Sequence, residues 1–283
     1  MAISDGDGQP RRRDIGVALG RLRRQAGRTE KDAAAILDWS SARVAGMELG
    51  LAAIRVGDVN ALLDLYGATD GERDRLLDEA RGARDRCWWR PYGDLINESF
   101  ETQLILEDEA SGLRTYQPNL VPGLLQTERY AMELIETQAD LPLNEVRTQA
   151  SLRAMRQQIL TRQNAPSLSV VLDEAVLRRP VGDGAVMREQ YALLAEVASA
   201  PGMTIQVLPF RAGPYHVLGL GFHIFDFGAD EPTIVELELL DRVRFVAESR
   251  EVAHYEHAFG RVSSLALSVE DSRLLLSEFA SAA

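Results

Sequence analysis

The chain has 283 residues, 46% of them hydrophobic, which is enough for about two globular domains with buried cores. It contains no run of about 18 apolar residues, which excludes a membrane-spanning helix, and residues 1–10 lack the apolar core of a signal peptide. The single cysteine, Cys87, excludes an internal disulfide, lacks neighbours that would complete a metal site, and favours a cytoplasmic location.

The formal net charge of -12 is distributed unevenly along the chain. Residues 9–55 carry nine arginines and one lysine against five acidic residues, a net +5, whereas residues 56–283 carry -15. A basic N-terminal region followed by an acidic remainder favours a polyanionic partner that contacts the N-terminal region only. The alternative is that the Arg-rich helices are simply solvated.

The N-terminal third has the apolar spacing of a helical bundle. Ile15, Leu19 and Leu22 recur at i, i+4 and i+7, which predicts a first helix that ends near Gly27. The same type of spacing predicts two later helices, at 59–66 and 70–84.

The most informative stretch of the chain lies between the first helix and the helix at 59–66. It predicts two short helices over 30–37 and 41–49, joined by a tight polar turn. Thr29 and Ser40 are predicted to be the N-caps of these helices, and Gly50 is predicted to end the second one. Apolar residues lie where the two helices must pack together: Ala34, Leu37, Val44 and Met47. Such a pair of helices places a recognition helix in the major groove of DNA.

The run Cys87-Trp88-Trp89-Arg90-Pro91 breaks the helical pattern and predicts a domain boundary. We therefore expect a disordered tail at 1–10, a helix-turn-helix domain at 11–86 and an effector-binding, partner-binding and dimerisation domain at 87–283. The paired tryptophans are expected to cover the seam between the two domains, with a docking surface as the alternative.

The remainder predicts an α+β domain, because strands are grouped after helices and are followed by more helices. Residues 100–116 have helical spacing, although a strand through 104–106 is an alternative. Further helices are predicted at 127–137, 143–163, 186–200, 251–264 and 269–282, the last with a capping box from Ser268 and Asp271. Strands are predicted at 167–172, 204–208, 221–227, 233–239 and 243–247. The whole fold is thus a mostly α helix-turn-helix bundle followed by an α+β domain.

The stretch over 29–50 resembles the XRE-type helix-turn-helix regulators, the family of the phage repressors. The matching residues are Thr29, Ala33 or Ala34, Ser40, Val44, Met47, Glu48 and Gly50. Residues 88–279 resemble the uncharacterised C-terminal domain of many actinobacterial regulators, with VPGLLQTERYA at 121–131 as the most specific run. The resemblance implies a transcriptional regulator, often encoded beside a small partner protein and antitoxin-like in some relatives.

The same resemblance implies that bases are read from Ser41, Ala42, Ala45 and Gly46, all small residues. Arg43 is the one long side chain of that helix able to reach DNA, and Glu30 replaces the glutamine that contacts phosphate in the family. We therefore expect modest direct readout, with positioning contacts from Arg11, Arg12, Arg13, Arg28, Lys31 and Arg43. The candidate DNA-contacting residues are Arg28, Thr29, Lys31, Ser40, Ser41, Ala42, Arg43 and Gly46; complete loss of DNA binding is the alternative.

The C-terminal part offers few candidates for chemistry. His254 and His257 share a helix face at i, i+3, but without a third ligand we expect exposed histidines and no metal site. Tyr215 and His216 lie in a Gly-rich loop between strands, which makes them candidates for an effector site, with a plain hairpin connection as the alternative. No catalytic or cofactor-binding motif is present, so we expect neither an enzyme nor a cofactor.

These observations favour a cytoplasmic DNA-binding transcriptional regulator that forms a homodimer on double-stranded DNA. Its C-terminal domain is expected to sense a small-molecule effector or a small partner protein. One alternative is an antitoxin-like interaction module that binds a small partner protein with little DNA specificity. Another is an enzyme built on the α+β domain.

Overall fold

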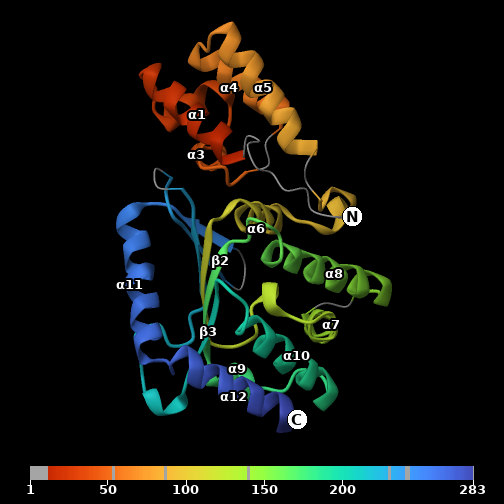
Figure 1. The fold of residues 1–283 in the computed structure, drawn as a ribbon. Helices are drawn as coiled ribbons and strands as arrows, with labels where there is room; N and C mark the ends of the chain where they lie inside the picture. The colour runs from red at the N-terminus through yellow and green to blue at the C-terminus, as the bar shows by residue number, and fades with distance from the viewer. Residues whose placement is uncertain are drawn as a thin grey trace. The chain divides into compact units, whose positions relative to one another are not determined.

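A computed structural model describes residues 12–52, 55–85, 88–138, 141–228, 231–239 and 243–282 (Figure 1). The chain forms two compact units that divide between Glu109 and Ala110. The expectations for the tail at 1–10, for Arg11 and for Cys87 lie outside the described residues. Within the described ranges, no helix combines the length and apolarity needed to cross a membrane.

The N-terminal unit is helical and contains the five helices predicted from the apolar spacing. They are α1 (Arg12–Gln25), α2 (Glu30–Leu37), α3 (Ser41–Glu48), α4 (Val56–Tyr66) and α5 (Asp70–Asp85), followed by the 3-10 helix η1 (Arg90–Leu95) and α6 (Glu98–Glu109). The predicted stripe Ile15, Leu19 and Leu22 is buried in a core that α1 to α5 share. Gly27 and Gly50 follow α1 and α3 with positive φ angles, so both predicted stop signals are confirmed.

Helices α1 and α3 approach each other closely at Gly16. A methyl group at this position would lie 2.7 Å from the carbonyl oxygens of both Met47 and Glu48. Because these are backbone atoms, the helices would have to separate to admit a side chain.

Gly16→Ala is therefore expected to lower the free energy of unfolding of the N-terminal unit by about 1–3 kcal/mol. Urea unfolding followed by tryptophan fluorescence measures this unit, because all three tryptophans, Trp39, Trp88 and Trp89, belong to it. Gly57→Ala is the control, since a methyl group there meets nothing within 4 Å and a helical alanine stabilises by up to about 1 kcal/mol. Equal effects of the two substitutions would contradict close packing at Gly16.

The C-terminal unit is built on a six-stranded mixed sheet with the strand order β3-β2-β1-β4-β5-β6. The strands are β1 (Gly112–Gln117), β2 (Ser167–Asp173), β3 (Met203–Leu208), β4 (Phe222–Asp226), β5 (Ile234–Glu238) and β6 (Val243–Val246). The pairs β1–β2 and β2–β3 are parallel, and the pairs from β1–β4 to β5–β6 are antiparallel. The expected α+β class is confirmed, with three parallel strands joined by helices.

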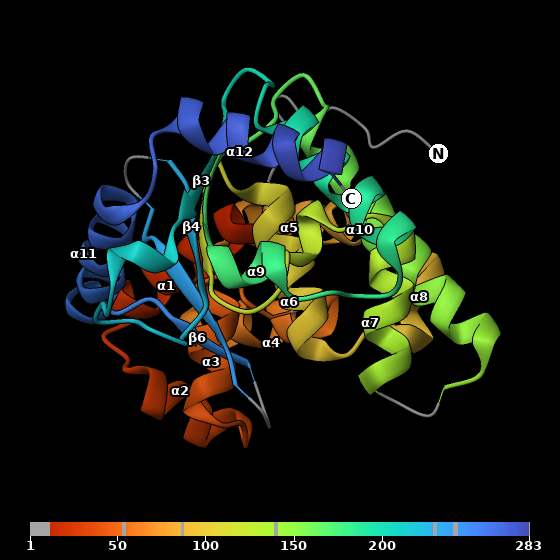
Figure 2. The ribbon, with the colours of Figure 1, turned by 90° about the horizontal axis from the view of Figure 1, so that it is seen from below.

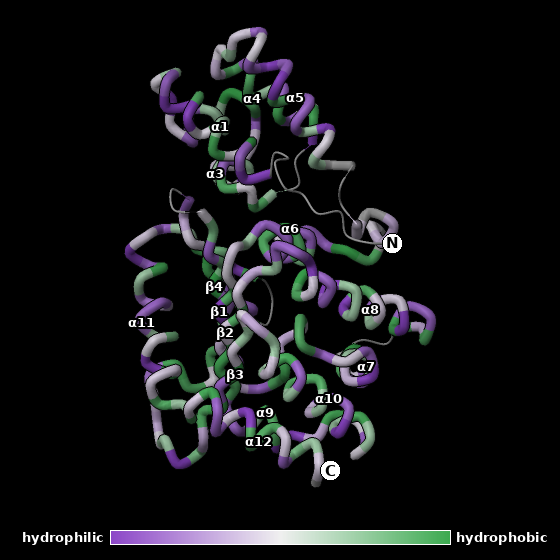
Figure 3. The backbone as a smooth tube through the Cα atoms, viewed as in Figure 1, coloured by the Kyte–Doolittle hydropathy of each residue, from purple (hydrophilic) through white to green (hydrophobic). Residues whose placement is uncertain are grey.

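Helices cover both faces of this sheet, as the views in Figures 1 and 2 show. One face packs against α11 (Ser249–Leu265), and the other is covered by α7 (Glu128–Gln138), α8 (Leu143–Arg156) and α10 (Gly184–Val197). The short α9 (Glu174–Arg178) follows β2, and α12 (Val269–Ala282) contacts α10 and β3. Figure 3 shows hydrophilic and hydrophobic residues mixed along the outer helices, as in helices with one buried face.

The prediction for 100–116 is wrong in its second half. Helix α6 ends at Glu109, and β1 runs through the centre of the sheet from Gly112 to Gln117. Strand β1 is buried on both faces, so Leu113 and Tyr116 give an apolar spacing that resembles a helix. The alternative strand through 104–106 is also wrong, because these residues belong to α6.

The other predicted elements of the C-terminal unit are confirmed with small shifts of their ends. Helix α8 ends at Arg156 and continues as the 3-10 turn η3 (Gln157–Leu160), before the end predicted at residue 163. The predicted variant of a capping box at α12 is also present: the amide of Asp271 donates to Ser268 Oγ at 3.0 Å, and the Ser268 hydroxyl donates to Asp271 Oδ2 at 2.7 Å.

Candidate functional site

The turn between α2 and α3 has an unusual residue at its tightest point. Asp38 ends α2 in the left-handed region, with φ 56° and ψ 42°, and is the only non-glycine residue with positive φ in the described ranges. Its amide donates to the carbonyl of Ala34, and the amide of Trp39 also donates to this carbonyl at 2.9 Å. Aspartate tolerates this conformation better than most residues, whereas glycine adopts it freely.

Asp38→Gly is expected to raise the free energy of unfolding of the N-terminal unit by about 0.5–1 kcal/mol, because glycine removes the steric cost of the left-handed backbone. Asp38→Val is expected to lower it by about 1–2 kcal/mol, since a β-branched residue fits this region worst. Tryptophan-detected urea unfolding of both variants gives the comparison. The reverse order would show that the Asp38 side chain stabilises the turn more than its backbone strains it.

Both helices of the motif begin with the predicted side-chain caps. Thr29 Oγ1 accepts from the amide of Asp32 at 3.1 Å, and the amide of Thr29 donates to Asp32 Oδ2 at 2.8 Å, a complete capping box. Thr29 Oγ1 also donates to Asp32 Oδ2 at 2.7 Å, and this hydrogen bond, followed by that from the Thr29 amide, lowers the pKa of Asp32. Ser40 Oγ accepts from the amide of Arg43 at 3.1 Å. Thr29 and Ser40 thus fix the start of each helix.

Arg43 is exposed on α3, but two neighbouring groups hold its guanidinium. It lies over the Trp39 ring, 4.2 Å from the centroid, and its Nη2 donates to Asp58 Oδ2 of α4 at 2.7 Å. The sequence-based prediction of DNA-contacting residues includes neither Trp39 nor Asp58. Of the small residues expected to read bases, Ser41 and Gly46 are half-buried, and the backbone of Ala42 is helical.

Basic side chains surround this motif. Arg28 is half-buried and Lys31 is exposed, and among the described residues neither makes an ion pair. Glu30, whose charge is unfavourable near phosphate, lies 3.4 Å from Arg23 Nη2. This ion pair compensates part of the Glu30 charge, and of the three basic residues around the motif Arg43 is already paired with Asp58, whereas Arg28 and Lys31 make no ion pair among the described residues.

Glu48, one of the residues shared with the XRE-type regulators, lies inside the bundle. Its carboxylate accepts from Arg23 Nε at 2.8 Å and from Arg23 Nη2 at 2.9 Å, and it also accepts from the Tyr66 hydroxyl at 3.2 Å. The hydrogen bond with Glu48 raises the pKa of Arg23, and burial, followed by the Glu48 charge, raises that of Tyr66. Glu48 therefore connects α1, α3 and α4 and supports the position of α3.

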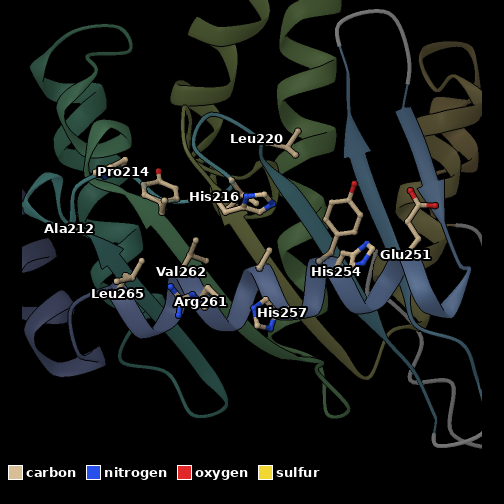
Figure 4. Close-up of a pocket in the computed structure, with 14 residues that line it drawn as sticks. Ala212, Pro214, His216, Leu220, Glu251, His254, His257, Arg261, Val262 and Leu265 are labelled. Carbon is tan, nitrogen blue, oxygen red and sulfur yellow. The ribbon is translucent and has the colours of Figure 1, made fainter.

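The C-terminal unit has a groove of about 770 Å³ between the loop at 212–220 and helix α11 (Figure 4). Tyr215 and His216, the two predicted effector-site residues, both line it. The Tyr215 hydroxyl donates to Asp173 Oδ2 at 2.6 Å and lies 2.5 Å from the Tyr116 hydroxyl. Burial is the main cause that raises the pKa of Tyr116 to about 12, and it also raises that of Tyr215. Both tyrosines are therefore neutral and anchor the loop to the sheet.

The structure separates the four histidines into two groups. His216, His254 and His257 line the groove, and the latter two are exposed on α11 as the sequence predicts. His223 lies on β4, with Nδ1 3.0 Å from Thr115 Oγ1 and Nε2 3.1 Å from Gln117 Nε2. Burial lowers the pKa of His223 to about 4, so it is a neutral, hydrogen-bonded histidine. Among the described residues, no three His, Cys, Asp or Glu side chains form a group able to hold a metal ion.

Two family models match the chain. Residues 14–76, from α1 into α5, match a helix-turn-helix domain, and residues 100–278, from α6 into α12, match a domain of unknown function (DUF5753). No curated protein and no solved structure matches the chain. The first match and the geometry of α2, the turn and α3 support a DNA-binding regulator. Because the second match covers more than half of its residues, the chain belongs to the DUF5753 family.

Proposed function

We propose that this protein is a transcriptional regulator that binds double-stranded DNA through α3 as a homodimer and senses a small molecule with its C-terminal unit. The observation that carries the proposal is the capped α2–turn–α3 motif with Arg28, Lys31 and Arg43 around it. Helix α3 presents its N-terminal half to the major groove, and the cations contact the flanking phosphates.

Dimerisation follows from the weak base readout of a single motif. Ser41, Ala42 and Gly46 offer at most single hydrogen bonds or methyl contacts to base edges, and none makes a bidentate contact. In a dimer, two N-terminal units, here called heads, bind two half-sites, and the modest affinity of each head is multiplied. The spacing of the half-sites and the DNA shape then supply specificity. An effector bound to the C-terminal unit would favour one arrangement of the two heads over another.

The groove beside Tyr215 and His216 supports a small molecule as the effector. Its volume of about 770 Å³ falls within the range of roughly 300–1,000 Å³ typical of small-molecule sites. The antitoxin-like alternative has a separate observation in its favour: Phe210 and Leu218, near the groove, are 57% and 64% exposed, as is common where a partner protein docks. That alternative would be favoured if the protein captured a defined partner encoded beside it and bound its own upstream DNA no more tightly than random DNA.

The test is binding of the full chain to the DNA upstream of its own coding sequence, measured by fluorescence anisotropy from 50 to 200 mM salt. Three cations per head neutralise about six phosphates in a dimer, which gives a slope near -5 in log affinity against log salt and a loss of about 10³ in affinity. Arg43→Ala is expected to weaken binding and to make the slope shallower by about 0.9 per head.

Arg250→Ala is the matched control, because Arg250 is an exposed arginine of α11 and is expected to leave both affinity and slope unchanged. Absence of binding at 50 mM salt would refute the proposed regulator. Equal slopes for the wild type and Arg43→Ala would instead remove Arg43 from the DNA-contacting surface.

A further inference from the structure

The groove between the 212–220 loop and α11 has two walls that carry apolar side chains. Ala258, Val262 and Leu265 recur along α11 at spacings of four and three residues and form one wall, and Val217 and Leu220 of the loop form the other. Two of these side chains, Leu220 and Leu265, remain 38% exposed at the groove. The groove thus offers apolar contact area for the hydrophobic part of a ligand.

The charged residues of the groove are not balanced. Glu251, near one end, already accepts an ion pair from Arg244, with 2.7 Å between Arg244 Nη2 and Glu251 Oε1. Arg261, ten residues further along α11, is exposed and makes no ion pair among the described residues. At a rise of about 1.5 Å per residue, the two charges are roughly 15 Å apart along the helix. One end of the groove therefore carries an uncompensated positive charge.

Imidazole groups add hydrogen-bond donors to the same surface. Three of the four histidines of the chain line the groove, and His254, His257 and Arg261 recur at i, i+3 and i+7, so they lie along one side of α11. Figure 4 shows His216 on the loop across from α11, with Glu251 and Arg261 toward opposite ends of the row of lining side chains. The ring N–H groups of histidine donate hydrogen bonds, and a carboxylate accepts them.

We propose that this groove binds a small organic acid, with its carboxylate at Arg261 and its apolar body along Val262, Leu265 and Leu220. Charge complementarity selects this class, because an amine at this end of the groove would meet the guanidinium of Arg261, which makes no ion pair among the described residues. The statement that this organic acid is the effector rests on the proposed sensing function. Binding itself is measured independently of DNA.

The experiment compares three ligands with the same phenyl and alkyl body: 4-phenylbutyrate, 4-phenylbutanol and 4-phenylbutylammonium. Isothermal titration of the full chain is expected to show the carboxylate binding about tenfold more tightly than the alcohol, and the ammonium ion more weakly than both. Arg261→Gln is expected to bring the affinity for the carboxylate down to that for the alcohol, without changing the affinity for the alcohol. Arg250→Gln, on the same helix but outside the groove, is expected to change neither.

A second variant tests the apolar body. Leu220→Ser is expected to weaken binding of the carboxylate and the alcohol by the same factor, because it removes a contact that both ligands share. Equal affinities for all three ligands, no binding of any of them, or a carboxylate preference that survives Arg261→Gln would each overturn the organic-acid assignment. If DNA binding by the full chain persists in those cases, the regulator proposal stands and only the ligand class fails.

Discussion

Glu48→Ala is expected to lower the free energy of unfolding of the N-terminal unit by about 3–5 kcal/mol. Only 7% of the Glu48 side chain and 11% of the Arg23 side chain are exposed, so the substitution leaves the guanidinium of Arg23 buried without its main partner. It also removes the acceptor of the Tyr66 hydroxyl. The loss belongs to α1, α3 and α4 together, because Glu48 joins one residue of each helix.

Urea unfolding followed by tryptophan fluorescence measures this loss, and the chain contains a matched control. Arg21 and Glu72 form an ion pair at 2.8 Å, but their side chains are 46% and 31% exposed. Glu72→Ala is therefore expected to lower the free energy of unfolding far less than Glu48→Ala does. If Glu48→Ala costs as little as Glu72→Ala, the buried ion pair does not hold α3 in place, and water compensates Arg23 instead.

Glu48→Gln separates charge from hydrogen bonding at the same position. The glutamine amide keeps an oxygen acceptor for Arg23 and Tyr66 but lacks the negative charge. The free energy of unfolding of Glu48→Gln is therefore expected to lie between those of Glu48→Ala and the wild type. The loss of stability should also appear in DNA binding. Because Glu48 lies in the core and not on the exposed face of α3, Glu48→Gln is expected to weaken DNA binding only under conditions in which part of the protein is unfolded.

The parts of the fold that follow from local chemistry could be predicted from the sequence. Thr29, Ser40 and Gly50 each act on neighbouring residues, so the ends of α2 and α3 are encoded within a few positions. Strand β1 could not be separated from α6, because a central strand buried on both faces loses the alternation that marks a half-buried strand.

The full set of residues in each candidate site could not be predicted from the sequence, because these residues come from distant parts of the chain. The Gly-rich loop drew attention to Tyr215 and His216, but the groove also needs α11, which lies about forty residues later and faces the loop only because both cover one side of the sheet. Likewise, Arg43 and Asp58 are fifteen residues apart on different helices. Apolar spacing indicates which helix faces are buried, but it does not show which polar side chains of different helices meet.

Asp58→Asn is expected to increase the DNA affinity of the protein about tenfold at 150 mM salt. In the free protein, the Asp58 carboxylate holds Arg43 Nη2 at 2.7 Å and competes with a phosphate or a base edge for the same donor. Asparagine removes that competitor and one negative charge from the proposed DNA-contacting side, while the Trp39 ring still supports the guanidinium. The slope of log affinity against log salt is expected to stay near that of the wild type, because Arg43 contacts the same phosphate in both proteins and Asp58→Asn only removes the cost of breaking the ion pair.

Anisotropy titrations of the wild type, Asp58→Asn, Arg43→Ala and the double variant test the mechanism. In the Arg43→Ala background, Asp58→Asn is expected to lose most of its effect, since no guanidinium remains to be released. Asp64→Asn is the control on the same helix, because Asp64 pairs with Arg73 and not with α3. If Asp58→Asn weakens binding instead, the carboxylate orients Arg43 toward DNA, and the ion pair is part of the bound state rather than a restraint on the free protein.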